Sequence, residues 1–183
     1  YQLSSTMRKQ AISFGCDIVS NISISELELS ANYKSVIVNG NRKYTAKSII
    51  LATGGRSRTL NVEGEADFKG KGISYCATCD GDFFQDKEIV VVGGGNSALE
   101  EADSLTKFAS KVTVLHEFNH FQAFEHAVEK AKSNPKINFI MNSHIIGFSG
   151  DQKLNQITYK NLETGDTLKK AVDGVFIFIG YVA

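Results

Sequence analysis

The glycine-rich stretch "EIVVVGGGNSALEEA", residues 88–102, constrains the fold more than any other part of the sequence. An apolar β-type run precedes the glycines, and a helical run with Ala98, Ala102 and Leu105 on one face follows them. A second β-type run covers residues 111–116, so the pattern predicts a βαβ unit. Parallel strands joined by a crossover helix are typical of α/β folds whose sheet is buried on both faces.

The glycines of this stretch fit the dinucleotide-binding pattern G-x-G-x-x-A at Gly93, Gly95 and Ala98. The first glycine permits a tight turn, the second lets backbone approach a pyrophosphate, and the small third residue lets the helix pack close to the strand. Asn96 and Ser97 open the predicted helix, residues 96–109, and are capping candidates. The pattern therefore predicts a dinucleotide site, and the alternative is a glycine turn that serves packing alone.

The end of the second strand indicates which dinucleotide would bind. Glu117 lies 24 positions after Gly93, where an acidic residue accepts hydrogen bonds from the ribose hydroxyls of NAD. No Lys or Arg occurs between Val112 and Glu129, so the extra phosphate of NADP would meet no cation. Charge therefore favours NADH over NADPH. The alternatives are that no nicotinamide nucleotide binds well and that Glu117 is a solvated charge.

The remaining pattern predicts two similar halves. The first half contains a helix over residues 3–14 that ends at Gly15, three short alternating strands, and the apolar run "SIILATGG", residues 48–55, expected as a buried strand. The second half follows the βαβ unit with a helix over residues 123–133, a strand, three alternating strands and the apolar run "GVFIFIG". We therefore expect a Rossmann-like three-layer α/β domain with a β-meander, residues 59–183, and part of a second similar domain, residues 1–58, truncated at its start.

Composition narrows the class of partner. Lys and Arg total 20, as do Asp and Glu, so no net field attracts nucleic acid or an anionic membrane. No apolar run of about 18 residues is present for a membrane span, and the amino end is not a signal peptide. We therefore expect a cytoplasmic protein that binds neither nucleic acid nor membrane.

Two of the three cysteines form a Cys-x-x-Cys pair, Cys76 and Cys79, a dozen residues before the glycine turn. The remaining potential ligands show no second paired spacing, so we expect no metal site. Such a pair closes a small disulfide ring, and a helix N-terminus stabilises one thiolate. The adjoining Asp80 is a candidate for carrying a proton to or from a thiolate. The isolated Cys16 is expected to be a small buried apolar residue.

The block "SYCATCDGDFF", placed before "VVVGGGNSALEEA" and after "ILATGG", resembles the low-molecular-weight thioredoxin reductases and related peroxiredoxin-reducing flavoproteins. The resemblance covers essentially the whole chain. It implies an FAD-dependent oxidoreductase, a homodimer, that passes electrons from a reductant through FAD to a Cys76–Cys79 disulfide and on to thioredoxin or a similar protein. It further implies that the nucleotide domain rotates, so that its thiols face FAD in one orientation and thioredoxin in the other.

Site residues follow from the resemblance position by position. Cys79 is similar to the thiol nearest the flavin, Cys76 to the thiol that attacks or releases thioredoxin, and Asp80 to the acid that protonates the outgoing thiolate. Thr53 and Gly54 match the segment that lies against FAD. The nucleotide site matches Gly93, Gly95, Asn96, Ser97, Ala98, His116, Glu117 and Gly180.

Two departures from the family pattern leave alternatives open. The family's H-R-R-x-x-x-R, which holds the NADP phosphate, reads "HEFNHFQ" here, with His116 kept and every arginine lost. This is similar to NADH-using members and to members that take electrons from ferredoxin, and the sequence does not choose between them. The first glycine motif and the last segment of the FAD site have no counterpart, so the chain alone is expected to be inactive. The alternative function is a non-catalytic nucleotide-binding module with a structural Cys pair.

Overall fold

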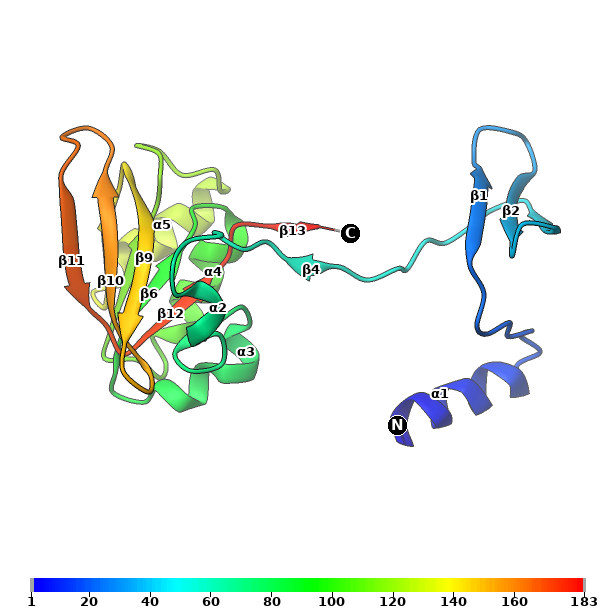
Figure 1. The fold of residues 1–183 in the computed structure, drawn as a ribbon, viewed down its shortest axis with the longest axis horizontal. Coiled ribbons are helices and arrows are strands. Elements are labelled where there is room, and N and C mark those ends of the chain that lie inside the picture. Colours follow the sequence, from blue (N-terminus) through cyan, green and yellow to red (C-terminus); the bar gives the residue numbers. More distant parts are fainter. Residues whose placement is uncertain (1, 183) are drawn as a thin grey trace. The chain divides into compact units, whose positions relative to one another are not determined.

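The computed structural model describes residues 2–182, and their contacts divide the chain into two compact units between Thr53 and Gly54. The sequence had placed a domain boundary a few residues later, between residues 58 and 59. Each unit has its own secondary structure, and Figure 1 labels the elements in both. Within the described residues no helix is both long and apolar enough to cross a membrane.

The first unit consists of one helix and one small sheet. Helix α1 (Gln2–Ser13) is followed by strands β1 (Ile24–Glu28), β2 (Lys34–Val38) and β3 (Arg42–Ala46), which form an antiparallel sheet in that order. The turn between β2 and β3 has positive φ at Asn39 and Gly40, the conformation that a hairpin turn requires. The predicted helix and meander are both confirmed.

Two predictions for the first unit are wrong. The apolar run at residues 48–55 is not a strand, and Ile50 is 91 % exposed. An apolar run becomes a buried strand only when other strands pair with it, and within residues 2–182 no strand pairs with this one. Cys16 is also exposed rather than buried, and among the described residues of this unit only Ser35 and Val38 are buried.

The second unit is built on a five-stranded parallel sheet in the order β5-β12-β6-β7-β8. Its strands are β5 (Ile73–Ser74), β12 (Gly174–Ile177), β6 (Glu88–Val92), β7 (Lys111–Leu115) and β8 (Ile137–Ile140). The apolar run at residues 174–180 therefore supplies the interior strand β12, inserted between β5 and β6. The predicted α/β fold with a buried parallel sheet is confirmed.

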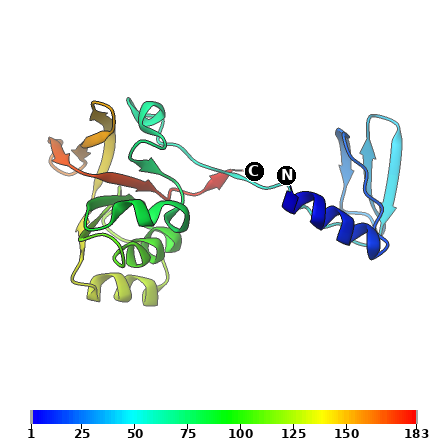
Figure 2. The ribbon, with the colours of Figure 1, turned by 90° about the horizontal axis from the view of Figure 1, so that it is seen from below.

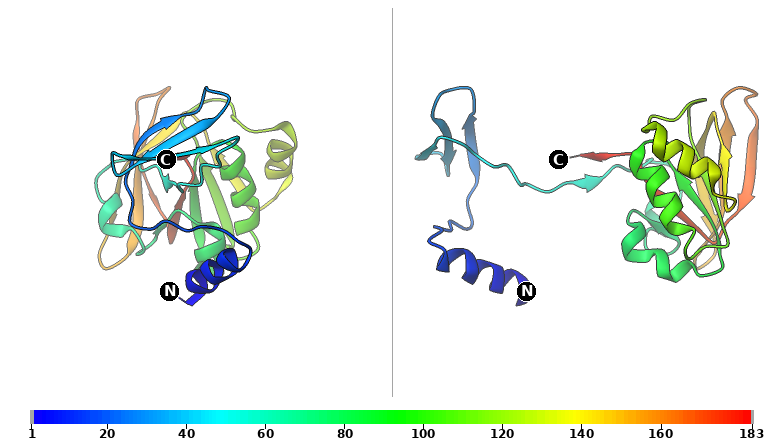
Figure 3. Two further views of the ribbon diagram at one scale, coloured as in Figure 1. Left: turned by 90° about the vertical axis from the view of Figure 1, so that its right-hand side faces the viewer. Right: turned by 180° about the vertical axis from the view of Figure 1, so that it is seen from behind.

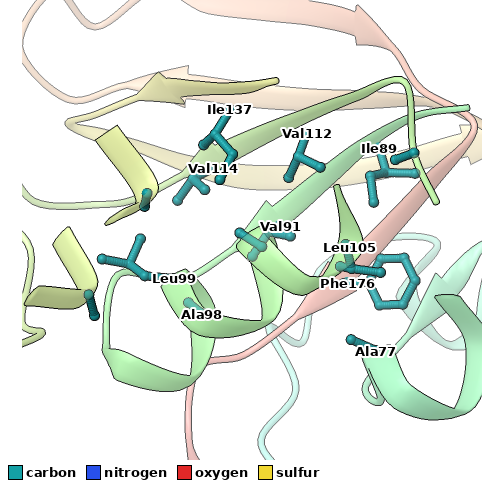
Figure 4. Packing of buried hydrophobic residues seen from close by; sticks show 14 residues of the cluster. Ala77, Ile89, Val91, Ala98, Leu99, Leu105, Val112, Val114, Ile137 and Phe176 are labelled. Carbon is teal, nitrogen blue, oxygen red and sulfur yellow. The ribbon is translucent and has the colours of Figure 1, made fainter. Parts of the chain in front are cut away.

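Helices α4 (Asn96–Leu105) and α5 (Glu125–Ser133) cover one face of this sheet (Figure 2). Alternate residues of the strands point toward them, as Figure 4 shows for Val91, Val112 and Val114 around Leu99. This period of two is what a pleated strand imposes on its side chains. The predicted buried face of α4 is confirmed, because Ala98, Ala102 and Leu105 belong to this core.

The opposite face of the sheet is covered by the second meander (Figure 3). Strands β9 (Ser143–Gly150), β10 (Leu154–Asn161) and β11 (Thr167–Ala171) form an antiparallel sheet in the order β11-β10-β9. Ile145 and Ile157 of this meander pack with the strand residues that point away from the helices, including Val90, Val92 and Leu115. The unit thus has the three expected layers of helices, parallel sheet and meander.

Several short elements were not predicted, because they are too short for a periodic pattern. Strand β4 (Arg56–Ser57) pairs with β13 (Tyr181–Val182), so the segments that enter and leave the second unit lie side by side. Helix α2 (Glu65–Phe68) lies in the expected loop, and helices α3 (Ala77–Asp80) and η1 (Gly81–Phe84) follow the first cysteine.

Candidate functional site

The three glycines of the turn between β6 and α4 are needed for different reasons. A Cβ on Gly93, whose φ is +133°, would lie 2.3 Å from the carbonyl oxygen of Phe178, and a Cβ on Gly94 would lie 2.4 Å from the ring of His116. A Cβ on Gly95 would meet nothing closer than a carbonyl oxygen at 3.9 Å. The fold itself therefore excludes side chains at the first two positions, whereas Gly95 keeps an open approach to the backbone.

The start of α4 departs from the expected capping. Gly95 is the N-cap residue, and no side chain caps the helix. The side chain of Asn96 instead accepts a hydrogen bond from the backbone N–H of Phe124 at 2.7 Å, which fixes the loop before α5. Asn96 and Ser97 are therefore not caps, and the N–H groups of the first turn of α4 keep no partner within the helix.

A cleft of about 1360 Å³ opens at the carboxyl ends of the parallel strands, and the glycine turn lies in its wall. In open α/β sheets, ligands bind in the crevice outside these strand ends. The cleft brings together all the residues expected to hold a nucleotide: Gly93, Gly95, Asn96, Ser97, Ala98, His116, Glu117 and Gly180. Thr53 and Gly54 lie at the boundary of the two units, exposed and outside any regular element.

His116 is a packed part of the cleft wall. Its imidazole is buried, stacks on Phe121, meets the edge of Phe118, and has Nε2 within 3.1 Å of the His120 carbonyl oxygen. Burial lowers the pKa of His116, because the charged form is poorly solvated there. The neutral ring therefore packs directly against the backbone of Gly94, a contact that no sequence pattern predicts.

The charges of the cleft correct the sequence-based count of cations. Glu117 is exposed and is the one acidic residue among the lining residues, but Arg56, Arg58 and Lys69 also line the cleft. Within residues 2–182 none of these three cations forms an ion pair with a carboxylate. They come from a segment more than forty positions before Glu117, so inspection of residues 112–129 alone could not find them.

The two cysteines of the Cys-x-x-Cys pair form a disulfide at the start of α3. Cys76 is the N-cap residue, and the backbone N–H of Cys79 donates to Cys76 Sγ at 3.2 Å. A smaller pocket of about 250 Å³ is lined by Cys76 and by residues that also line the nucleotide-type cleft, among them Tyr75, Ser97, Phe178 and Gly180. The pocket beside the disulfide and the cleft beside the glycine turn therefore share lining residues.

Asp80 is held beside the disulfide by Ser74. The Ser74 hydroxyl donates to Asp80 Oδ2 at 2.6 Å, and Ser74 Oγ accepts a hydrogen bond from the N–H of Cys76 at 3.0 Å. Ser74 is buried in β5, so the carboxyl group is attached to a rigid strand. The structure thus brings the three expected catalytic residues together, with Ser74 hydrogen-bonded to Asp80 and to the backbone of Cys76.

A buried carboxylate fixes the wall between the two cavities. Glu65 is only 4 % exposed, and it accepts hydrogen bonds from the N–H groups of Leu60 and Asn61 and from the hydroxyl of Tyr75 at 2.7 Å. Burial and the Glu65 hydrogen bond raise the pKa of Tyr75. Glu65 therefore attaches the loop that carries Arg58 to the residue directly before the disulfide.

Known proteins resemble the chain over almost its whole length. It is 44 % identical to a thioredoxin reductase of Peptoclostridium acidaminophilum over 96 % of this chain and 57 % of that protein. The solved thioredoxin reductase of Lactococcus lactis superposes with a TM-score of 0.76 at 38 % identity, over 98 % of this chain and 59 % of that one. A ferredoxin-flavin thioredoxin reductase from Clostridium acetobutylicum superposes with a TM-score of 0.52 at 25 % identity, over 96 % and 55 %.

These similarities confirm the resemblance to thioredoxin reductases that the sequence predicted. The chain spans somewhat more than half the length of the relatives it matches. The family model for pyridine nucleotide-disulphide oxidoreductases matches residues 7–183. With its glycine turn, cleft and adjacent disulfide, the chain belongs to the pyridine nucleotide-disulphide oxidoreductase family.

Proposed function

We propose that the chain is the thiol-carrying part of an FAD-dependent thioredoxin reductase. In this proposal electrons pass from a reductant through FAD to the Cys76–Cys79 disulfide and on to thioredoxin or a similar disulfide protein. The observation that carries the proposal is the shared wall between the disulfide pocket and the nucleotide-type cleft. A structural Cys pair would need no such cavity beside it.

We assign residues 1–58 to part of an FAD domain and residues 59–183 to the nucleotide domain. Thr53 and Gly54 are the FAD contacts that this assignment offers, and both are exposed. We expect the purified chain to be colourless. Stoichiometric FAD on the purified chain, measured by its visible absorbance, would contradict this assignment.

We also propose a cytoplasmic location and a homodimer.

The cleft fits a dinucleotide, because Gly95 leaves the space that a pyrophosphate needs and the first turn of α4 offers free N–H groups. A bound reduced nicotinamide supplies two electrons as a hydride equivalent. Glu117 accepts hydrogen bonds from ribose hydroxyls, and His116 holds Gly94 in place from below. Arg58 and Lys69, on the wall of the same cleft, partly neutralise the phosphates.

The disulfide performs the second half-reaction by exchange. After two electrons and two protons convert it to a dithiol, the Cys76 thiolate attacks a disulfide of the partner and a mixed disulfide forms. Cys79 then attacks Cys76 Sγ and releases the partner as a dithiol. The N–H of Cys79 favours the thiolate at Cys76, and Phe83, which is 79 % exposed in η1, offers an apolar contact for a protein partner.

Three electron donors are compatible with the proposal: NADH, NADPH and ferredoxin. Glu117 favours NADH, whereas the three cations of the cleft would tolerate the extra phosphate of NADPH. The similarity to a ferredoxin-flavin thioredoxin reductase supports the ferredoxin alternative. Mixing the flavoprotein that carries this chain with each donor without oxygen, and following flavin bleaching, separates the three. We expect NADH to bleach the flavin, and rapid bleaching by NADPH alone would contradict the charge argument.

The two outer glycines of the turn provide a test of the dinucleotide site. Gly95→Ala places a methyl group in open space, so we expect an intact fold and at least tenfold weaker binding of NADH by calorimetry. Gly93→Ala drives a methyl group into the Phe178 carbonyl, so we expect it to lower the stability of the fold itself. Equal NADH affinity in Gly95→Ala and the parent chain would remove the dinucleotide from the proposal.

Thiol titration tests whether the Cys pair cycles. The chain has three cysteines, of which Cys16 is free and exposed, so we expect one reactive thiol before mild reduction and three after it. Reoxidation should return the number to one. A pair that resists mild reductant in the folded chain would favour the alternative of a nucleotide-binding module with a structural disulfide.

A further inference from the structure

Ser74 is the centre of three hydrogen-bond contacts beside the disulfide. Its buried Oγ lies 2.6 Å from Asp80 Oδ2, 3.0 Å from the Cys76 nitrogen and 3.2 Å from the Cys76 carbonyl oxygen. A hydroxyl has one proton to donate and two lone pairs that accept. Two oxygens therefore compete for the single Ser74 proton, and the protonation state of Asp80 decides between them.

We propose that Ser74 is a positioning residue for Asp80, whose hydroxyl turns between two hydrogen-bond states as the carboxyl group loses or gains its proton. The inference rests on the proposed function, and on the role of acid that the resemblance to thioredoxin reductases gives to Asp80. It concerns a residue that neither the Cys-x-x-Cys pattern nor the glycine pattern contains.

Both states keep the Ser74 hydroxyl, Asp80 Oδ2, the Cys76 N–H and the Cys76 carbonyl oxygen hydrogen-bonded. When Asp80 is ionised, the Ser74 hydroxyl donates to Asp80 Oδ2 and accepts from the Cys76 N–H. When Asp80 is protonated, its O–H donates to Ser74 Oγ, and the Ser74 hydroxyl donates to the Cys76 carbonyl oxygen instead. That oxygen keeps the Asp80 N–H as a partner at 3.2 Å in either state. Asp80 therefore gives up a proton without leaving an unpaired buried polar atom.

The step that uses this arrangement is reduction of the disulfide by a thiolate. An external thiolate attacks one sulfur, the Cys76–Cys79 bond breaks, a new disulfide forms to the attacking sulfur, and the electron pair stays on the released sulfur. The proton of Asp80 passes to that sulfur, and the Ser74 hydroxyl turns to stabilise the new carboxylate. Positioned acids of this kind accelerate proton transfer by about 10²–10⁴-fold.

The test compares Ser74→Thr with Ser74→Val, two side chains of nearly equal shape that differ in the hydroxyl. The assay is the rate at which dithiothreitol reduces the disulfide of the purified chain, quantified by alkylation and mass spectrometry. We expect Ser74→Val to react about tenfold more slowly than Ser74→Thr. In an Asp80→Asn background, where no proton can be transferred, we expect the two rates to agree within twofold.

Equal rates for the Thr and Val variants, or the same ratio with and without Asp80, would overturn the role of Ser74. Asp80→Asn as fast as the parent would instead remove the proposed acid. The assay contains no FAD, nucleotide or thioredoxin, so its outcome is separate from those parts of the proposed function. Circular dichroism checks each fold, and Ser74→Ala replaces Ser74→Val if the latter does not fold.

Discussion

The two apolar runs that close the two halves of the chain have similar sequences and opposite surroundings. "SIILATGG" is exposed and forms no strand, whereas "GVFIFIG" supplies β12, which lies between β5 and β6 with every residue of the strand buried. Their local signals are equal, but only the second run has partner strands and two covering layers. An apolar run in the sequence therefore indicates where a strand can form. Whether the strand forms depends on the strands that can pair with it in the folded protein.

The meanders repeat the contrast. In the second unit Ile157 is buried within the meander layer, while in the first unit Ile24 and Leu27 of β1 are exposed. Both sheets are antiparallel with short turns, so their backbone patterns agree. What differs is the presence of a parallel sheet against which one face can pack.

The largest expected effect comes from removing the same atoms in the two apolar runs. Ile177 is 1 % exposed, so Ile177→Ala leaves a cavity and should lower the free energy of unfolding of the second unit by about 2–5 kcal/mol. Ile50→Ala, at an exposed position of the first unit, should change the free energy of unfolding of that unit by about 0.5 kcal/mol or less. Urea unfolding measures both free energies, and comparable losses in the two variants would contradict the difference in burial between the two apolar runs.

A smaller effect is expected from two glutamates of the two units. Glu65→Gln keeps the shape but leaves one buried N–H donor without an acceptor, which should cost about 1–3 kcal/mol. Glu26→Gln, on the exposed strand β1, is the matched control and should have almost no effect. If the two variants unfold at the same urea concentration, Glu65 does not anchor the cleft wall.

The smallest effect is a dependence of the free energy of unfolding on pH near 6.5, which we expect in the second unit because all four histidines lie there. Burial lowers the pKa of His116 below its usual 6.5. Just below pH 6.5 the imidazole is therefore protonated in the unfolded chain but still neutral in the folded chain. The free energy of unfolding should therefore rise with pH toward 7 and fall as pH drops through 6.5. His116→Gln should flatten this slope in unfolding series at several pH values, and an unchanged slope would assign it to other groups.

The sequence predicted most of the second unit, because the spacing of apolar residues in a long segment indicates both the element and the face that it buries. The strand, turn and helix around Gly93, the amphipathic helix α5 and the second meander were all expected and all found. The sequence failed where the signal was short or the partner distant. The two-residue strands β4 and β13 have no periodicity, Asn96 bonds to a residue 28 positions away, and Glu65 resembles any surface glutamate in a loop.

The amino-acid sequence by itself determined the class of fold, the glycine turn and the position of the Cys-x-x-Cys pair, because these depend on spacing within one segment. Only the tertiary structure decided which cations line the cleft, that His116 supports Gly94, and that Ser74 holds Asp80 beside the disulfide. These contacts join side chains from separate elements. Their existence depends on how the elements pack, which no local pattern specifies.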